Sequence, residues 1–126
     1  MEKRIIESKN APAPIGPYNQ AVLSGSTLYL SGQIAIDPLS QEFVNGSVEE
    51  QTNLVMSNLK AVLNEADMGF ENVVKSTIYV TDLNDFTKVN AIYGDAFVIN
   101  PPARETVQVA ALPKGAKVEI SMIALK

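Results

Sequence analysis

The first third of the chain alternates between short runs rich in β-forming residues and loops rich in turn-forming residues. The runs cover residues 3–8, 20–24 and 27–36, and a loop with three prolines and one glycine, residues 10–18, follows the first of them. The connection at residues 24–26 is short and contains a glycine, which predicts a hairpin between the second and third runs. This part of the chain is therefore expected to form three strands.

A long helix is predicted after the third strand. Ser47 and Glu50 match the capping-box pattern that begins many helices. Positions at intervals of three and four residues then form one helical face: Val48, Thr52, Val55, Leu59, Val62 and Ala66. The pattern ends near residues 67–69, so about nineteen residues make a helix of roughly 28 Å, which is long enough to cross a sheet.

A second helix is predicted after the strand at residues 73–80, with Asp82 or Asn84 as its cap. Its stripe consists of Leu83, Phe86, Asn90, Tyr93 and Phe97. One member of this stripe, Asn90, is polar, and it is either a hydrogen-bonded core amide or a functional residue.

Two more strands are predicted at about residues 104–111 and 117–125, which gives the order β-β-β-α-β-α-β-β. Both helices lie on connections between strands, and right-handed crossovers place both on one face of a mixed sheet. The predicted fold class is therefore α+β. The opposite face of the sheet needs another cover, most simply a second copy of the chain.

Composition is typical of one globular domain over residues 1–126, since 46% of the residues are hydrophobic and 19% are charged. The net charge of -4 and the scattered lysines argue against a nucleic-acid partner, which requires clustered positive charge. The chain has no cysteine and no histidine, which excludes thiolate and imidazole chemistry. Neither a signal peptide nor a stretch long enough to span a membrane is evident, so a cytoplasmic protein without a membrane partner is expected.

Arg104 is one of two arginines in the chain and directly follows Pro-Pro-Ala. Alternation along the strand places Arg104, Thr106 and Gln108 on one face and directs Glu105 away from them. Arg104 is therefore expected to share its face with polar groups.

Glu119 is a candidate for proton transfer. It lies between Val118 and Ile120 in the last strand, and partial desolvation of a carboxyl favours its neutral form. A hairpin through the turn at residues 113–115 would place Glu119 within a few residues of Gln108 across the ladder.

Each of these residues also has a purely structural explanation, which the pattern alone does not exclude. Arg104 and Glu119 can be surface residues or members of a structural ion pair. Tyr18 can anchor its loop, and Gly32, next to Ser31, can mark a β-bulge rather than a close approach to a ligand.

Several kinds of catalytic site are excluded by the sequence. No phosphate-binding glycine motif and no G-x-S-x-G elbow is present, and no carboxylates cluster at the spacing of a metal site. The remaining possibility is general acid–base catalysis, in which a carboxylate acts on water and an arginine binds an anionic substrate.

Five blocks of the sequence together resemble the reactive intermediate deaminase family, RidA, also called the YjgF family. The blocks cover nearly the whole chain in collinear order: Ala13 to Tyr18, Leu30 to Ile34, Val89 to Tyr93, Pro102 to Arg104, and Ala111 to Gly115 with Val118 to Ile120. The resemblance implies a fold like that of the chorismate mutase of bacilli, with a six-stranded mixed sheet, two helices on one face and a homotrimer with sites in clefts between subunits.

The resemblance also implies an activity, which is hydrolysis of 2-imino acids or their enamine tautomers to 2-keto acids and ammonia. The substrates are 2-iminobutanoate and 2-iminopropanoate, which arise from pyridoxal-phosphate enzymes. No cofactor and no metal are implied, because a protonated imine is already an electrophile. An alternative is a trimeric protein that binds small carboxylates without turning them over. RNA cleavage has also been attached to relatives, but the acidic balance of the chain weighs against it.

Individual residues take roles by their match to the family. Arg104 matches the arginine that binds the substrate carboxylate, and Glu119 matches the glutamate that positions or activates water. The other pocket positions are Tyr18, Ser31, Gly32 and Asn90, and Thr106 keeps a small polar group on the side of the site. The family pattern has a small hydroxyl residue directly after the arginine, where this chain has Glu105, which is expected near the mouth of the site.

Overall fold

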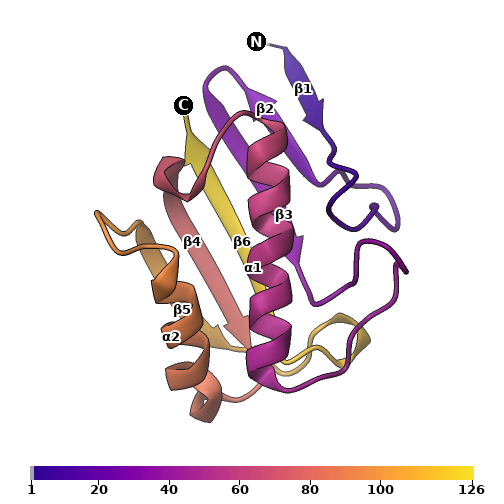
Figure 1. Ribbon diagram of the computed structural model, residues 1–126, viewed down its shortest axis with the longest axis vertical. Helices are drawn as coiled ribbons and strands as arrows, with labels where there is room; N and C mark the ends of the chain where they lie inside the picture. The colour runs from indigo at the N-terminus through magenta and orange to yellow at the C-terminus, as the bar shows by residue number, and fades with distance from the viewer. Residues whose placement is uncertain (1) are drawn as a thin grey trace.

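The computed structural model describes residues 2–126 and contains one six-stranded mixed sheet with two α-helices on the same face (Figure 1). The strands are β1 (Lys3–Ile6), β2 (Ala21–Ser24), β3 (Thr27–Gln33), β4 (Val73–Val80), β5 (Ala103–Gln108) and β6 (Val118–Leu125). The helices are α1 (Val48–Glu65) and α2 (Phe86–Asp95). The strands lie in the order β1-β2-β3-β6-β4-β5, and only β4 and β5 are parallel. The predicted fold class, element order and placement of the helices are confirmed.

Helix α1 begins where the sequence predicts and supplies much of the core. The Ser47 hydroxyl accepts a hydrogen bond from the Glu50 backbone N–H, and the Glu50 carboxylate accepts one from the Ser47 backbone N–H. This reciprocal pair satisfies two N–H groups that the first turn leaves without helical partners. The apolar face of α1 packs against the sheet, and Val55, Leu59 and Val62 are fully buried.

Helix α2 starts later than the stripe predicts. Asp82 caps a short 3-10 turn, Leu83–Asp85, by accepting a hydrogen bond from the Asn84 backbone N–H, and α2 follows directly at Phe86. A 3-10 turn has three residues per turn, so it rotates Leu83 away from the face that α2 packs on the sheet. Leu83 is 51% exposed, and its inclusion in the buried stripe was wrong.

The predicted hairpin between the last two strands was also wrong. Strand β5 pairs only with β4, at the edge of the sheet, whereas β6 lies between β3 and β4. Glu119 is therefore opposite Tyr79 of β4 and not near Gln108 of β5. The physical reason is the crossover through α2, which makes β5 parallel to β4. The nine residues between β5 and β6 then pass the end of β4 instead of making a tight turn.

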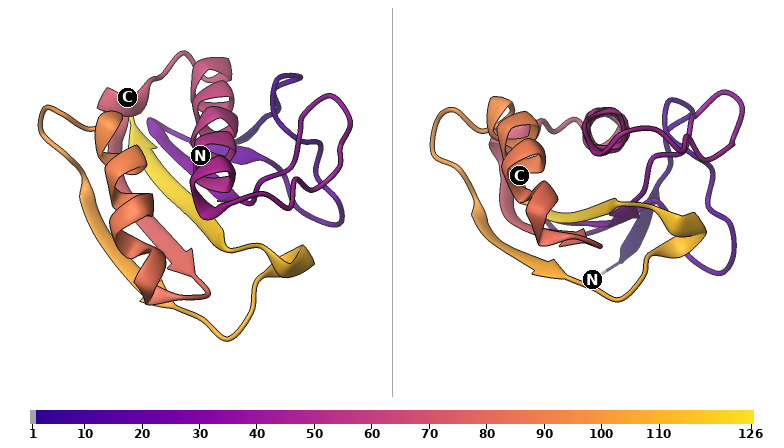
Figure 2. Two further views of the ribbon diagram at one scale, coloured as in Figure 1. Left: turned by 60° about the horizontal axis from the view of Figure 1, so that its bottom comes forward. Right: turned by 90° about the horizontal axis from the view of Figure 1, so that it is seen from below.

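No segment of residues 2–126 covers the sheet face away from α1 and α2, and we call it the open face (Figure 2). Four large hydrophobic side chains on it are between 41% and 51% exposed: Ile5, Tyr29, Val107 and Leu125. An uncovered apolar surface of this kind is typical of a protein interface.

Candidate functional site

A cavity of about 500 Å³ lies between the N-terminal loop, the end of β3 and β6. It brings together four of the residues predicted for the site: Tyr18, Ser31, Gly32 and Glu119. Ser31 and Gly32 are nearly ninety positions from Glu119 in the sequence, and strand pairing between β3 and β6 places them side by side. We call this group the carboxylate half-site.

Glu119 is the acidic group of the carboxylate half-site. Its side chain lies on the open face, because Ile120 beside it faces the helices and is fully buried. Burial of the carboxyl raises its pKa above the usual range for glutamate. The predicted desolvation is thus confirmed, and the structure gives Glu119 no ion-pair partner within residues 2–126.

Gly32 leaves the space that the Glu119 carboxyl occupies. A Cβ atom placed on Gly32 would lie 2.5 Å from Oε2 and 2.9 Å from Cδ of Glu119, closer than van der Waals contact allows. The backbone of Gly32 does not require glycine, because its φ lies outside the left-handed region. Glycine is therefore explained at this position by the carboxyl above it.

The N-terminal loop is attached to the carboxylate half-site by Gln20, which the sequence analysis did not single out. Gln20 is 1% exposed, and its side chain accepts a hydrogen bond from Ser8 N–H and donates to the Pro12 carbonyl. Ser31 adds a second attachment, since its hydroxyl donates to the Asn19 carbonyl at 2.6 Å. These three hydrogen bonds hold the loop that carries Tyr18, which is 47% exposed.

Lys114 is a second residue of the cavity wall that the sequence analysis did not predict. It follows Pro113 in a 3-10 turn and has a positive φ of 58°. The signal available in the sequence was the Pro-Lys-Gly turn, which marks a bend but not its place beside the cavity.

Arg104 lies in a different part of the molecule, on β5 beneath α2. Its register partner on β4 is Ser76, which is fully buried on the helix side of the sheet, so Arg104 points to the same side. Nη1 of Arg104 donates to Oδ1 of Asn90 at 2.7 Å. The guanidinium carbon lies 5.5 Å from the ring centroid of Phe86 and 5.2 Å from that of Tyr93. We call this group the arginine half-site.

Asn90 and Thr106 belong to the arginine half-site. Asn90 is exposed, which excludes the alternative of a buried core amide, and its oxygen is used by Arg104. Thr106 shares the helix-side face with Arg104, and its hydroxyl oxygen is buried without a hydrogen-bond partner in residues 2–126. Alternation along β5 correctly predicted that Arg104 and Thr106 share one face of the sheet, whereas their membership of a substrate site stays a prediction.

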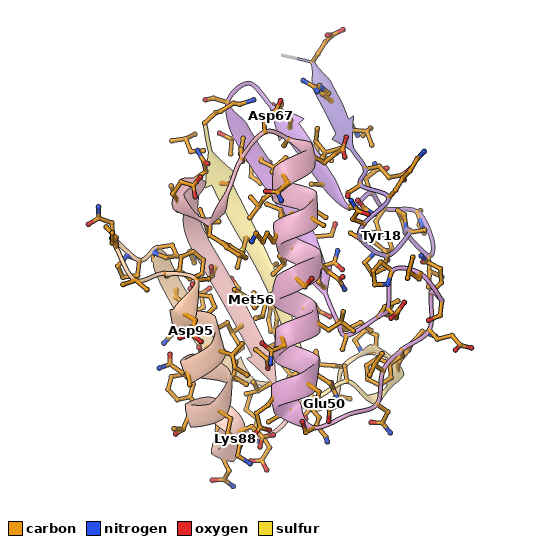
Figure 3. The ribbon with its side chains drawn as sticks, in the orientation of Figure 1. Tyr18, Glu50, Met56, Asp67, Lys88 and Asp95 are labelled. Atoms are coloured by element: carbon orange, nitrogen blue, oxygen red, sulfur yellow. The ribbon has the colours of Figure 1, made fainter. Side chains whose placement is uncertain are left out.

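The two half-sites do not meet within one chain. Glu119 points to the open face and Arg104 to the helix side, and β4 lies between their strands. From standard strand spacing, their Cα positions are about 10 Å apart across the sheet and about 10 Å along it. In Figure 3, Tyr18 of the carboxylate half-site lies on the other side of α1 from Lys88 and Asp95 of α2.

The side chain of Glu105 lies on the opposite face of the sheet from Arg104. Its carboxylate pairs with Lys75 Nζ at 3.1 Å on the open face, where the two side chains are 55% and 37% exposed. It is the one ion pair within residues 2–126, so Arg104 and Glu119 do not form the structural ion pair considered as an alternative. Glu105 also does not line the cavity, and the expectation that it lies near the mouth of the site stays a prediction.

Across residues 2–126, no helix is both long enough and apolar enough to span a membrane. In the same residues, no three acidic side chains come together as a group that could hold a metal ion.

Comparisons with known proteins give consistent matches over almost the whole chain. The sequence profile of the family described as Endoribonuclease L-PSP matches residues 8–126. Protein DfrA of Myxococcus xanthus is 52% identical over 99% of this chain and 97% of its own length. The human 2-iminobutanoate/2-iminopropanoate deaminase is 47% identical over 98% of this chain and 90% of its own. The crystal structure of Escherichia coli TdcF with bound serine is 40% identical, covers 98% of both chains and has a TM-score of 0.92.

Proposed function

Because the chain belongs to the Endoribonuclease L-PSP family, which is the RidA or YjgF family, we propose that it hydrolyses 2-iminobutanoate and 2-iminopropanoate to 2-keto acids and ammonia. The observation that carries the proposal is the pair of half-sites. One offers an arginine without an ionic partner in residues 2–126, and the other offers a half-buried carboxyl with a raised pKa. The name of the human relative supports the same reaction.

The chemistry needs only these groups and water. The substrate is a planar 2-iminium carboxylate, and the Arg104 guanidinium binds its carboxylate through two parallel N–H donors. Water attacks the iminium carbon, the electrons of the C=N π bond move to nitrogen, and Glu119 takes a proton from the attacking water. Glu119 then returns this proton to the nitrogen of the carbinolamine. The C–N bond breaks as the C=O bond forms, and the hydroxyl proton leaves with ammonia as ammonium.

The reaction requires both half-sites at one substrate, and a homotrimer with sites in clefts between subunits meets this requirement. Support comes from the uncovered apolar open face and from the separation of Arg104 from Glu119 within the chain. In this arrangement one copy supplies the arginine half-site and its neighbour supplies the carboxylate half-site.

The experiment that tests the function couples the protein to a threonine dehydratase, which releases the imine, in the presence of semicarbazide as a trap. The proposal predicts that adding this protein reduces semicarbazone formation in proportion to its concentration. Undiminished trapping at protein concentrations above that of the dehydratase would contradict it.

A binding protein without catalysis is the second candidate, and the serine-bound relative is the observation that favours it. It would bind 2-ketobutanoate in a manner that depends on Arg104 and would leave the rate of imine loss unchanged. Endoribonuclease activity, which the family description names, has less support, because the chain has 14 acidic residues against 10 basic ones and no run of basic residues. Salt-sensitive RNA binding would be needed to favour it.

Substituting Gly32→Ala is expected to lower kcat by about 10- to 100-fold, because the new Cβ displaces the Glu119 carboxyl and misplacement of about 1 Å is costly in catalysis. The melting temperature should change little, since the displaced atoms are the end of a flexible side chain. Steady-state kinetics and thermal denaturation measure the two effects. Gly94→Ala is the matched control, because a Cβ at Gly94 meets no atom within 4 Å and should leave kcat unchanged.

A further inference from the structure

Helix α2 presents three side chains to Arg104 at helical spacing. Phe86, Asn90 and Tyr93 are four and three positions apart, so they lie on one face of the helix, directly over β5. The amide binds an edge of the guanidinium, whereas both rings lie within about 6 Å of its carbon, the range of a cation–π contact. The stripe of α2 that predicts core packing therefore also surrounds the Arg104 guanidinium.

The aromatic part of these surroundings is rigid. Tyr93 is 3% exposed, and its ring packs on Phe97 with centroids 4.6 Å apart. Phe97 in turn meets Phe70 edge to face at 5.4 Å. The Tyr93 ring is therefore fixed by the core, whereas Phe86 is half-buried at the start of α2 and can be changed without opening the core.

The rings and a carboxylate use different parts of the guanidinium. A guanidinium is planar, and its five N–H donors point outward in its plane while its faces remain available for stacking. The one hydrogen bond of these donors within residues 2–126 goes to Asn90. The cation–π contacts with the two rings use none of these donors, which leaves an edge with two parallel donors for a carboxylate.

We propose that Phe86 and Tyr93 are positioning residues that hold the Arg104 guanidinium in the orientation in which it receives the substrate carboxylate. The inference rests on the proposed function for the identity of the ligand. The rings restrict the rotamers of a long, exposed side chain before binding, so less conformational freedom is lost when the carboxylate arrives. The rings act through Arg104 and do not touch the reacting atoms.

This role predicts an effect on binding rather than on the chemical step. The substrate carboxylate keeps its charge from the ground state to the transition state. An interaction with it therefore stabilises both states equally, and its loss appears in KM. Removing one ring removes a cation–π contact and the restriction that the ring places on the Arg104 side chain. Binding of the carboxylate should therefore weaken by about fivefold. The expected signature is a raised KM with kcat within about twofold of the parent protein.

The test compares Phe86→Leu, which removes the ring, with Phe86→Tyr, which keeps it. Calorimetric titration with 2-ketobutanoate should give a Kd about fivefold higher for Phe86→Leu and an unchanged Kd for Phe86→Tyr. Thermal denaturation checks that both variants fold. If Phe86→Leu does not fold, Phe86→Met replaces the ring with a flexible apolar side chain and carries the same expectation.

A second measurement does not depend on any ligand. The chain has two arginines, Arg4 and Arg104, so a nitrogen-15 spectrum contains only two arginine Nε–Hε signals. Ring currents should displace the Arg104 signal, and Phe86→Leu should move it toward that of exposed Arg4, whereas Phe86→Tyr should not. If the protein binds no keto acid but the Arg104 signal still moves in Phe86→Leu, the proposed function is contradicted, whereas the contact between Phe86 and Arg104 is supported. An unchanged Kd together with an unmoved signal in Phe86→Leu would overturn the inference.

Discussion

Substituting Arg104→Lys is expected to lower kcat/KM for 2-iminobutanoate by about 100-fold, although the positive charge is retained. An ammonium cannot make two parallel hydrogen bonds to one carboxylate, and hydrogen bonds to charged groups contribute about 1.5–3 kcal/mol each. The substitution also removes the planar group that lies between Asn90 and the two rings. Initial rates of keto-acid formation measure the effect.

The second arginine provides the control for this prediction. Arg4 is exposed on β1 and lies outside both half-sites, so Arg4→Lys should leave kcat/KM unchanged. An Arg104→Lys protein that keeps kcat/KM within threefold of the parent would show that a single positive charge is sufficient to bind the substrate carboxylate. The assignment of bidentate carboxylate binding to Arg104 would then be wrong.

Substituting Glu119→Gln is expected to lower kcat by about 10²–10⁴-fold, the usual contribution of a positioned acid-base group. The amide has the shape of the carboxyl but cannot accept a proton from water. In the parent protein, kcat should rise with pH as Glu119 ionises. Its raised pKa places this rise at higher pH than for an ordinary glutamate. The variant should lack the acidic limb in a pH-rate profile. An unchanged limb would contradict the role of Glu119.

Stability should change in the opposite direction in the same variant. The folded state raises the pKa of Glu119, so ionisation costs stability as the pH rises from the unfolded pKa through the folded one. Glu119→Gln removes this cost, and its melting temperature at pH 7 should equal or exceed that of the parent. The difference in melting temperature between the variant and the parent should vanish at pH values below the usual pKa of a glutamate carboxyl. Exposed Glu65→Gln is a matched control, which should change neither kcat nor its pH dependence.

The local parts of the fold follow from the sequence because short-range forces determine them. The capping box of Ser47 and Glu50 and the spacing along α1 are contacts between near neighbours, and both predictions were confirmed. Alternation likewise predicted that Arg104 and Glu105 point to opposite faces, which the ion pair of Glu105 with Lys75 confirms. The cap does not determine the start of α2, because an Asp cap serves a 3-10 turn as well as an α-helix.

The long-range parts did not follow in the same way. A turn between two strands suggested that they pair, but β6 binds β3 and β4 instead of β5, and nothing local to residues 109–117 encodes that choice. The resemblance to a family supplied the candidate residues but not their distribution over two separate half-sites. Gln20 was missed because its buried hydrogen bonds to the loop become visible only when the loop has folded back.

The distribution over two half-sites gives the most direct test of the account. Arg104→Ala and Glu119→Gln should each be nearly inactive alone, and they should regain activity when the two proteins are unfolded, mixed in equal amounts and refolded together. If each site takes its arginine from one copy and its carboxyl from the next, random trimers contain both intact groups in about a quarter of their sites. The predicted result is therefore about one quarter of the parent activity in the mixture. Activity no greater than the mean of the two separately refolded variants would contradict a site shared between copies.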